Sequence, residues 1–311
     1  MIWLAWRQHR LALAAAAAVC LAATTYLLVL GSQLRGGLSP LNAASCLGSV
    51  AGCGEWESTM AALHGVQADV LRYAPALLGV FVGAPMLARE LEQRTLRYAW
   101  TQSVSRTHWL NVKILLPGAA LLLLSLVFSA ACMWFFAPAA DDRTWFQVFD
   151  AAPPVFAAKC LFSYALGVLA GLVLPRLLSS MALALAGFLA VVVPLTFWVR
   201  FSYLEPLRAP TEVYLRSGGM DGWLVGRTFT GPSGGEMSMQ EAFHDAGIPA
   251  SQTGYSTESL HQLERAGFTE VLLYQPADRF WTFQLIETGV LAVLAAACVW
   301  ATYRLLRRRA V

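Results

Sequence analysis

Long apolar stretches without Lys, Arg, Asp or Glu restrict the fold of this 311-residue chain more than any other feature. A helix rises 1.5 Å per residue, so about 20 apolar residues cross the hydrocarbon core of a bilayer. A transmembrane β-barrel would instead show short alternating segments. We therefore predict an all-α polytopic membrane protein. The uncharged stretches are 11–30, 114–138, 160–175, 177–199 and 288–303.

The composition agrees with a membrane protein. Hydrophobic residues make up 57% of the chain and charged residues 13%, whereas soluble domains carry about 25% charged residues. The first apolar stretch is too long for the core of a signal peptide. We expect six transmembrane helices, at about 11–30, 70–88, 110–137, 155–174, 181–199 and 284–303.

The segments between the helices divide the chain further. Residues 1–10 combine Trp3 and Trp6 with Arg7 and Arg10, a mixture that favours an interfacial elbow helix. Glycine- and serine-rich residues 31–69 indicate an external loop. The remaining parts are transmembrane helices one to five within 11–199, a cytosolic segment at 89–113, a small external domain at 200–283, and helix six with a basic tail at 284–311.

The distribution of Lys and Arg predicts the orientation. Twelve basic residues lie in short segments on one side of the predicted helices, and 17 of the 19 acidic residues lie on the other. We therefore place both termini in the cytoplasm and the chain in the plasma membrane. The basic residues of the inner side are Arg7, Arg10, Arg89, Arg94, Arg97, Arg106, Lys113, Arg176, Arg304, Arg307, Arg308 and Arg309.

Residues 200–283 are turn-rich, and they predict a small folded domain with a helix at about 256–266 and a strand at 270–274. Ser256 is the expected N-cap of the helix, and Gly267 follows its end. In the external loop, Cys46 and Cys53 suit a disulfide outside the reducing cytosol. A zinc site with His64 is less favoured, because the spacing matches no compact ligand pattern.

The charged residues next to the helices predict no ion pathway. We expect Lys159 and Glu287, at the outer ends of helices four and six, to extend toward lipid headgroups. Asp69 and Arg72 are three residues apart and would pair along one helix face. Since few charges lie at membrane depth, a proton- or sodium-coupled carrier is disfavoured. No G-x-x-x-x-G-K-[ST] motif occurs, so the chain has no Walker nucleotide site of its own.

The cytosolic segment 89–113, ARELEQRTLRYAWTQSVSRTHWLNVK with the preceding Ala88, is basic and rich in aromatic residues. Two interpretations follow from its composition: a docking surface at the membrane, or a connector that only fixes topology. Glu90 and Arg94, spaced i,i+4, would support a short helix there. If the apolar bundle is a pump, its energy must come from another protein, because this chain has no Walker site and few charges at membrane depth.

This segment resembles the loop between helices two and three of bacterial type-2 ABC exporter permeases. The family pattern has a Glu, a Gly-Thr pair, a Ser-Arg and a Lys before helix three. Here Thr95 follows Arg94 in place of the Gly. The opening MIWLAWRQHR and the late YQPADRFWTFQ are also similar to that family.

The resemblance implies a coupling helix at about Glu90–Trp100 that sits in a cleft of a separate ATPase subunit. It also implies a second permease copy or a related chain. ATP and Mg would bind the partner ATPase, and we expect no cofactor in this chain. The lipid bilayer is the remaining expected partner, and nucleic acid is not one. The residues implied in ATPase coupling are Glu90, Glu92, Arg94, Thr95, Arg97, Trp100, Ser105 and Arg106.

Three hypotheses follow. The first is the transmembrane permease subunit of an ATP-driven exporter that moves an amphipathic or apolar cargo outward. The second is a sensor or scaffold that binds an external ligand through residues 200–283. The third is a membrane-embedded enzyme with a site around Asp221, His244 and Asp278, although no spacing there matches a catalytic motif.

Overall fold

The computed structural model describes residues 2–37, 71–93, 106–140, 146, 148–216, 222–232, 234–248 and 257–309. The chain divides into two compact units. The helical unit consists of Met1–Pro138, Gln147–Arg200 and Thr282–Val311, and the second unit of Ala139–Phe146 and Phe201–Trp281.

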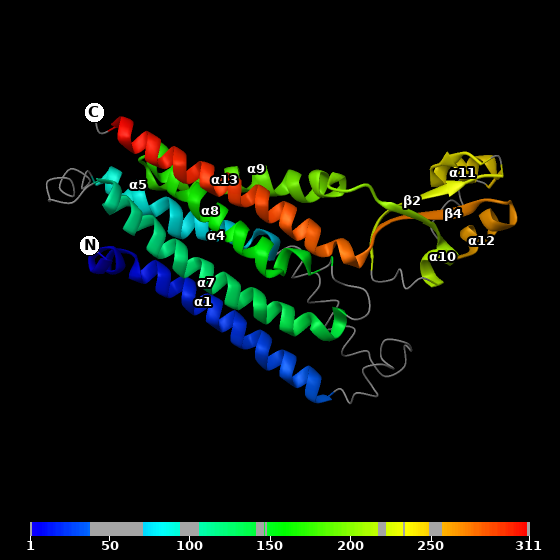
Figure 1. The fold of residues 1–311 in the computed structure, drawn as a ribbon, viewed down its shortest axis with the longest axis horizontal. Helices are drawn as coiled ribbons and strands as arrows, with labels where there is room; N and C mark the ends of the chain where they lie inside the picture. The colour runs from blue at the N-terminus through cyan, green and yellow to red at the C-terminus, as the bar shows by residue number, and fades with distance from the viewer. Residues whose placement is uncertain are drawn as a thin grey trace. The chain divides into compact units, whose positions relative to one another are not determined.

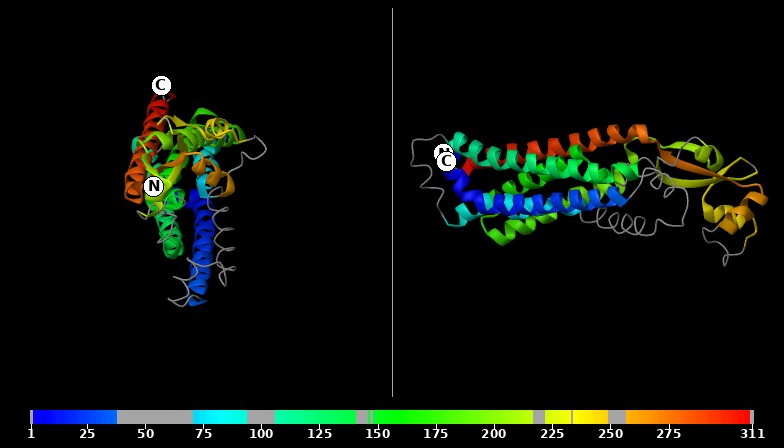
Figure 2. Two further views of the ribbon diagram at one scale, coloured as in Figure 1. Left: turned by 90° about the vertical axis from the view of Figure 1, so that its right-hand side faces the viewer. Right: turned by 90° about the horizontal axis from the view of Figure 1, so that it is seen from below.

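The long helices of the helical unit run roughly side by side (Figures 1 and 2). α1 begins and α13 ends at one end of this bundle, where α5 also ends and α7 begins. The predicted cytosolic segments therefore share one end. The bounds are α1 Ile2–Gly37, α5 Ala84–Glu92, α7 Arg106–Ala140, α8 Pro153–Val173, α9 Leu177–Pro194 and α13 Phe280–Arg309.

Five helices of the described residues are long and apolar enough to cross a membrane: 10–33, 109–137, 153–173, 177–202 and 277–308. They match five of the six predicted crossings. The helices extend beyond the predicted ends, since α1 continues to Gly37 and α13 starts at Phe280. α1 has no boundary near residue 10, so an elbow helix is not a separate element here.

The predicted second crossing is divided into α4 Pro75–Leu78, the π-helix η2 Gly79–Gly83 and α5. Pro85 has no N–H to donate to the preceding turn. The N–H of Ala84 bonds to the carbonyl of Gly79, five residues earlier, which gives the wider π turn. No piece by itself has the length of a span, and the sixth crossing stays a prediction.

The second crossing packs backbone to backbone against α8. Gly79 and Gly83 form one G-x-x-x-G pair, and Gly167 and Gly171 on α8 form another. A Cβ atom at Gly167 would lie 2.2 Å from the carbonyl oxygen of Gly79, and one at Gly171 would lie 2.4 Å from that of Ala84. Small residues let membrane helices approach this closely. The glycines therefore set the separation of the two helices.

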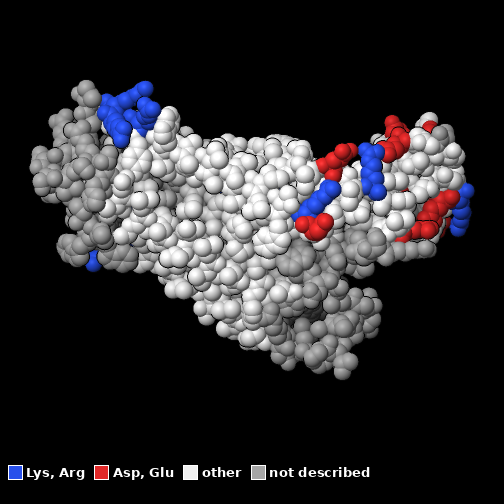
Figure 3. All heavy atoms as spheres, viewed as in Figure 1, with Lys and Arg blue, Asp and Glu red and all other residues white. Residues whose placement is uncertain are grey.

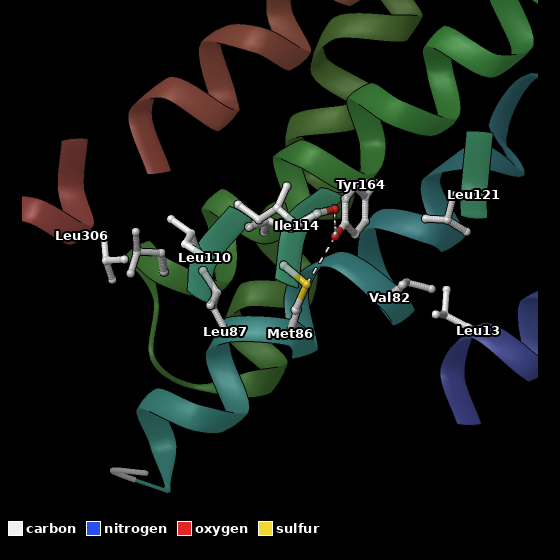
Figure 4. Close-up of a cluster of buried hydrophobic side chains, with 11 residues drawn as sticks. Leu13, Val82, Met86, Leu87, Leu110, Ile114, Leu121, Tyr164 and Leu306 are labelled. Atoms are coloured by element: carbon white, nitrogen blue, oxygen red, sulfur yellow. Dashed lines mark hydrogen bonds between the residues drawn. The ribbon is translucent and has the colours of Figure 1, made fainter. Parts of the chain in front are cut away.

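Apolar side chains from several helices meet beside this contact (Figure 4). Tyr164 lies among them and donates its hydroxyl hydrogen to the carbonyl oxygen of Ile114, at 3.0 Å. The polar tip of this buried ring is thereby satisfied. The cluster consists of Leu13, Val82, Met86, Leu87, Leu110, Ile114, Leu121, Tyr164, Val168, Leu172 and Leu306.

The outer surface of the helical unit is apolar. The middle of the helical unit shows no charged side chain on the face in Figure 3. α8 is mostly buried, whereas other helices expose large apolar side chains, as a lipid-facing surface requires. Examples are Leu11, Val19, Leu115, Leu123, Leu183, Phe197, Trp198, Val293 and Trp300. The chain is a multi-pass membrane protein.

The second unit contains a four-stranded antiparallel sheet of order β1-β4-β2-β3. The all-α prediction is therefore wrong for this part of the chain, because only one of its strands was expected. The strands are β1 Leu207–Pro210, β2 Trp223–Thr230, β3 Glu236–Met237 and β4 Thr269–Gln275, and the helices are α10 Thr211–Arg216, α11 Met239–Asp245 and α12 Thr257–Arg265.

β4 and α12 confirm the predicted strand and helix. Gly267 follows α12 with a φ of +84°, a left-handed conformation that suits glycine after a helix. Phe229, Phe243, Leu263 and Phe268 are packed together as a separate core. The unit therefore has a folded interior of its own, as predicted for residues 200–283, while its external location stays a prediction.

Candidate functional site

A buried ion pair joins the two helices that flank the predicted coupling segment. Nζ of Lys113 on α7 donates to Oε1 of Glu90 on α5, and the ammonium group also lies 4.7 Å from the ring centroid of Trp109. The Lys113 side chain is only 2% exposed. Because a buried charge without its partner is costly, this pair fixes the end of α5 against α7.

The structure places few of the predicted coupling residues. Glu90 and Glu92 lie in the last turn of α5, where Glu92 is exposed and Glu90 is turned toward Lys113. Arg106 begins α7. The other predicted residues lie outside the described part of the chain: Arg94, Thr95, Arg97, Trp100 and Ser105. The proposed disulfide of Cys46 and Cys53 lies outside it as well.

Lys113 lies within the predicted third helix, but the burial of its side chain was not predicted. Helix α7 starts at Arg106, so Lys113 is about two turns inside it and faces the bundle. The sequence carried one usable signal: Trp109 precedes Lys113 by four residues, so both lie on one helix face. The partner Glu90 comes from another helix and could not be found by spacing.

A second group of charged residues, Arg72, Asp150, Lys159, Arg200 and Glu287, lies at the other end of the bundle, near the start of α8. We call it the charge cluster. Asp150 Oδ1 accepts from Lys159 Nζ at 2.6 Å and from Arg200 Nη2 at 2.7 Å. Asp150 Oδ2 accepts from Arg72 Nε at 3.0 Å. One carboxylate thus holds three cations.

Glu287 on α13 completes the charge cluster. Arg200 forms a two-pronged contact with it, Nε to Oε2 and Nη2 to Oε1, each at 2.9 Å. Lys159 Nζ lies 3.6 Å from the same Oε1. Two-pronged guanidinium–carboxylate contacts are among the stronger ion pairs in proteins. The charge cluster therefore joins five segments of the helical unit, each of which contributes one residue.

The expectation that Lys159 and Glu287 extend to lipid headgroups is wrong. Both side chains are 0% exposed, because each faces the bundle and finds opposite charges there. Arg72 bonds to Asp150, 78 residues away; its proposed partner Asp69 lies outside the described residues. The cluster was missed because its members are far apart in sequence and each lies at the end of an apolar stretch.

Polar contacts around Asp150 hold it in place. Gln284 Nε2 donates to the carbonyl oxygen of Phe149 at 2.8 Å, and the amide N–H of Val155 donates to Gln284 Oε1 at 3.3 Å. The guanidinium of Arg200 lies 4.2 Å from the ring centroid of Phe149. These contacts position the short helix η3 Phe149–Ala151, so that its carboxylate faces the cations.

Asp150 should make stability depend on pH. Burial by itself would raise the pKa of Asp150, but Lys159 and Arg200 lower it well below its usual range. Stability from a lowered carboxyl pKa is present above the unfolded pKa of about 3.9 and is lost as pH falls toward the folded pKa. We expect the gap in unfolding temperature between wild type and Asp150→Asn to be constant above about pH 5 and to narrow below about pH 4. Thermal unfolding in detergent across pH measures this; a gap that widens on acidification would contradict it.

The residues of the enzyme hypothesis do not form a site in the described structure. His244 lies on α11 with a side chain that is 90% exposed, and its Nδ1 lies 3.5 Å from Asp245 Oδ1. Asp278 lies in η8 Ala277–Arg279, and no described interaction joins it to His244. Asp221 lies outside the described residues.

The comparisons agree with the resemblance drawn from residues 89–113. No curated protein matches the chain. A family model described as ABC-2 membrane transporter related matches residues 13–200, more than half of the chain and all of the described helices α4 to α9. The chain therefore belongs to the ABC-2 membrane transporter related family, whose members are membrane subunits of ABC transporters working with an ATPase partner.

Proposed function

We propose that this chain is the permease subunit of an ATP-driven exporter that moves an amphipathic or apolar cargo outward. In this proposal a separate ATPase docks on the segment between α5 and α7, and two permease chains enclose the pathway. The family supports the transporter class. The observation that carries the proposal further is the buried Glu90–Lys113 pair.

The pair supports a docking role because of where it lies. A segment that receives force from an ATPase must pass it to the bundle through rigid contacts. Residues 94–105 separate α5 from α7. The Glu90–Lys113 pair joins these two helices near the ends that flank residues 94–105. Movement of the segment would then move α5 and α7 together. α5 in turn lies close against α8 through Gly171, at the centre of the bundle.

Two acidic residues of α5 have different proposed roles. Glu90 is turned inward to Lys113, so it holds the segment in position. Glu92 and Arg89 are exposed in the last turn of α5, so they are available to the ATPase. The exposed residues would set the affinity of docking, while the buried pair would set how well docking is converted into helix movement.

Lys113→Met should therefore lower the maximal stimulation of the ATPase by the permease, by about 5-fold or more, the range of a typical coupling energy. Binding of the ATPase should change little, because the exposed surface of α5 is kept. The measurement is ATP hydrolysis in vesicles that contain both subunits, with copurification as the binding assay. The charge exchange Glu90→Lys with Lys113→Glu should restore part of the stimulation.

Glu92→Gln is the matched control, since it removes a carboxylate two residues away that is exposed. It should weaken ATPase binding without lowering the maximal stimulation. Wild-type stimulation by correctly folded Lys113→Met would show that the pair does not couple the subunits, and equal effects of both variants would contradict the division of roles.

A further inference from the structure

The charge cluster contains one more cation than its carboxylates balance. Arg72, Lys159 and Arg200 face Asp150 and Glu287. All four carboxylate oxygens of Asp150 and Glu287 already accept from these cations. Among the described residues, one positive charge of the cluster is therefore left without a matching carboxylate.

We assign the unbalanced positive charge to Arg72, because its side chain is the most exposed of the five in the charge cluster, at 17%. Its Nε donates to Asp150, while its two Nη groups have no acceptor among the described residues. An arginine carries five N–H donors, so four remain. Its guanidinium lies 5.4 Å from the ring centroid of Phe197.

The surroundings of Arg72 belong to the lipid-facing surface. Phe197 and Trp198 are 48% and 68% exposed on η4 Leu195–Val199. A guanidinium whose Nη donors have no acceptor among the described residues, beside an exposed aromatic ring, is suited to an anionic group arriving from the membrane.

The depth of the cluster fits a headgroup. Lys159 lies six residues from the start of α8, about 9 Å along the helix. The span at 277–308 has 32 residues, about 48 Å, which exceeds a hydrocarbon core of about 30 Å. Glu287 is ten residues from its start, so the cluster lies near the end of the apolar zone. Long arginine side chains near the end of a membrane helix extend outward to the level of the lipid headgroups.

We propose that Arg72 binds a phosphate oxyanion, supplied by the headgroup of an anionic lipid, at the edge of the bundle beside Phe197. The planar guanidinium presents its Nη donors to two phosphate oxygens, a geometry that arginine favours over lysine. The lipid supplies the negative charge that the described members of the cluster lack. The site is independent of ATPase docking and lies at the other end of the bundle from Glu90 and Lys113.

The test uses the full chain in lipid nanodiscs of phosphatidylcholine, with or without phosphatidylglycerol. Native mass spectrometry counts bound phosphatidylglycerol, and thermal unfolding reports stabilisation. Wild type should gain stability from phosphatidylglycerol, and Arg72→Gln should bind it about tenfold more weakly, as expected for loss of a charge-assisted contact. Arg72→Lys keeps the positive charge but loses the planar pair of Nη donors. Its binding of phosphatidylglycerol should therefore lie between that of wild type and that of Arg72→Gln.

Arg304→Gln is the matched control. Arg304 is an exposed arginine at the other end of α13, over the ring of Trp300 at 5.1 Å, and its loss should leave the phosphatidylglycerol effect of the charge cluster unchanged. Inorganic phosphate added to phosphatidylcholine discs separates the two sources of phosphate. Equal stabilisation by free phosphate would overturn the lipid assignment. Equal phosphatidylglycerol binding by wild type, Arg72→Gln and Arg72→Lys would overturn the site.

Discussion

Replacing Gly167 with Ala should destabilise the helical unit by about 1–3 kcal/mol, the usual cost of overpacking a well-packed interior. The added Cβ atom would lie 2.2 Å from the carbonyl oxygen of Gly79 and 2.9 Å from the amide nitrogen of Ala84. Both are backbone atoms and cannot rotate away as a side chain can. The helices must therefore separate, which also loosens the neighbouring contact at Gly171.

Gly289→Ala provides the control for this substitution. Gly289 is also in a long helix, α13, but a Cβ atom there meets no other atom within 4 Å. Its replacement should change stability by less than about 0.5 kcal/mol. Unfolding of the detergent-solubilised chain, followed by thermal or chemical denaturation, compares the two. Equal stability of the Gly167 and Gly289 variants would show that the second crossing and α8 do not pack this closely.

Glu287→Gln should have the larger effect, a loss of about 3–5 kcal/mol, as expected when one member of a buried ion pair is removed. Glu287 is 0% exposed and accepts from both Nε and Nη2 of Arg200. Without its charge, Asp150 alone faces Arg72, Lys159 and Arg200. The same denaturation measurement detects the loss.

A double variant separates the ion pairs from simple loss of packing. Lys159→Met combined with Glu287→Gln removes one charge of each sign, so its cost should be smaller than the sum of the two single losses by about 0.5–3 kcal/mol. Glu236→Gln is the control, because the Arg208–Glu236 pair is about half exposed and exposed pairs contribute at most about 1 kcal/mol. Strictly additive losses at Lys159 and Glu287 would show that the two charges do not interact.

The two buried ion groups have different relations to the proposed transport cycle. The Glu90–Lys113 pair lies at the end of the bundle that carries the predicted docking segment, and the charge cluster lies at the other end. Each joins helices that alternating access would have to move. Packing of backbone against backbone at Gly79 and Gly167 lies between them. The second crossing, α8 and their neighbours therefore form the rigid part through which the ends are connected.

Residue patterns alone predicted the membrane helices well. An uncharged, apolar stretch of about 20 residues is long enough to cross a bilayer, and there it must satisfy its backbone hydrogen bonds internally, as a helix does. Local signals also found α12 and β4, where Gly267 and alternating apolar residues identify ends and faces. The resemblance of residues 89–113 identified the family that the comparison then confirmed. The docking residues themselves stay a prediction, since most lie outside the described part of the chain.

Sequence by itself determined which segments are helical and apolar enough for a membrane, because hydrophobicity and hydrogen bonding within a helix depend on neighbouring residues. Only the tertiary structure decided which charges are buried and with what partners. Lys113 pairs with Glu90, which is 23 residues away in the sequence. Arg200 pairs with Glu287, which is 87 residues away. The cost of a buried charge depends on the oxygens and rings that surround it in space. No spacing within one helix contains that information, so Lys159 and Glu287 were expected to face headgroups and instead face each other.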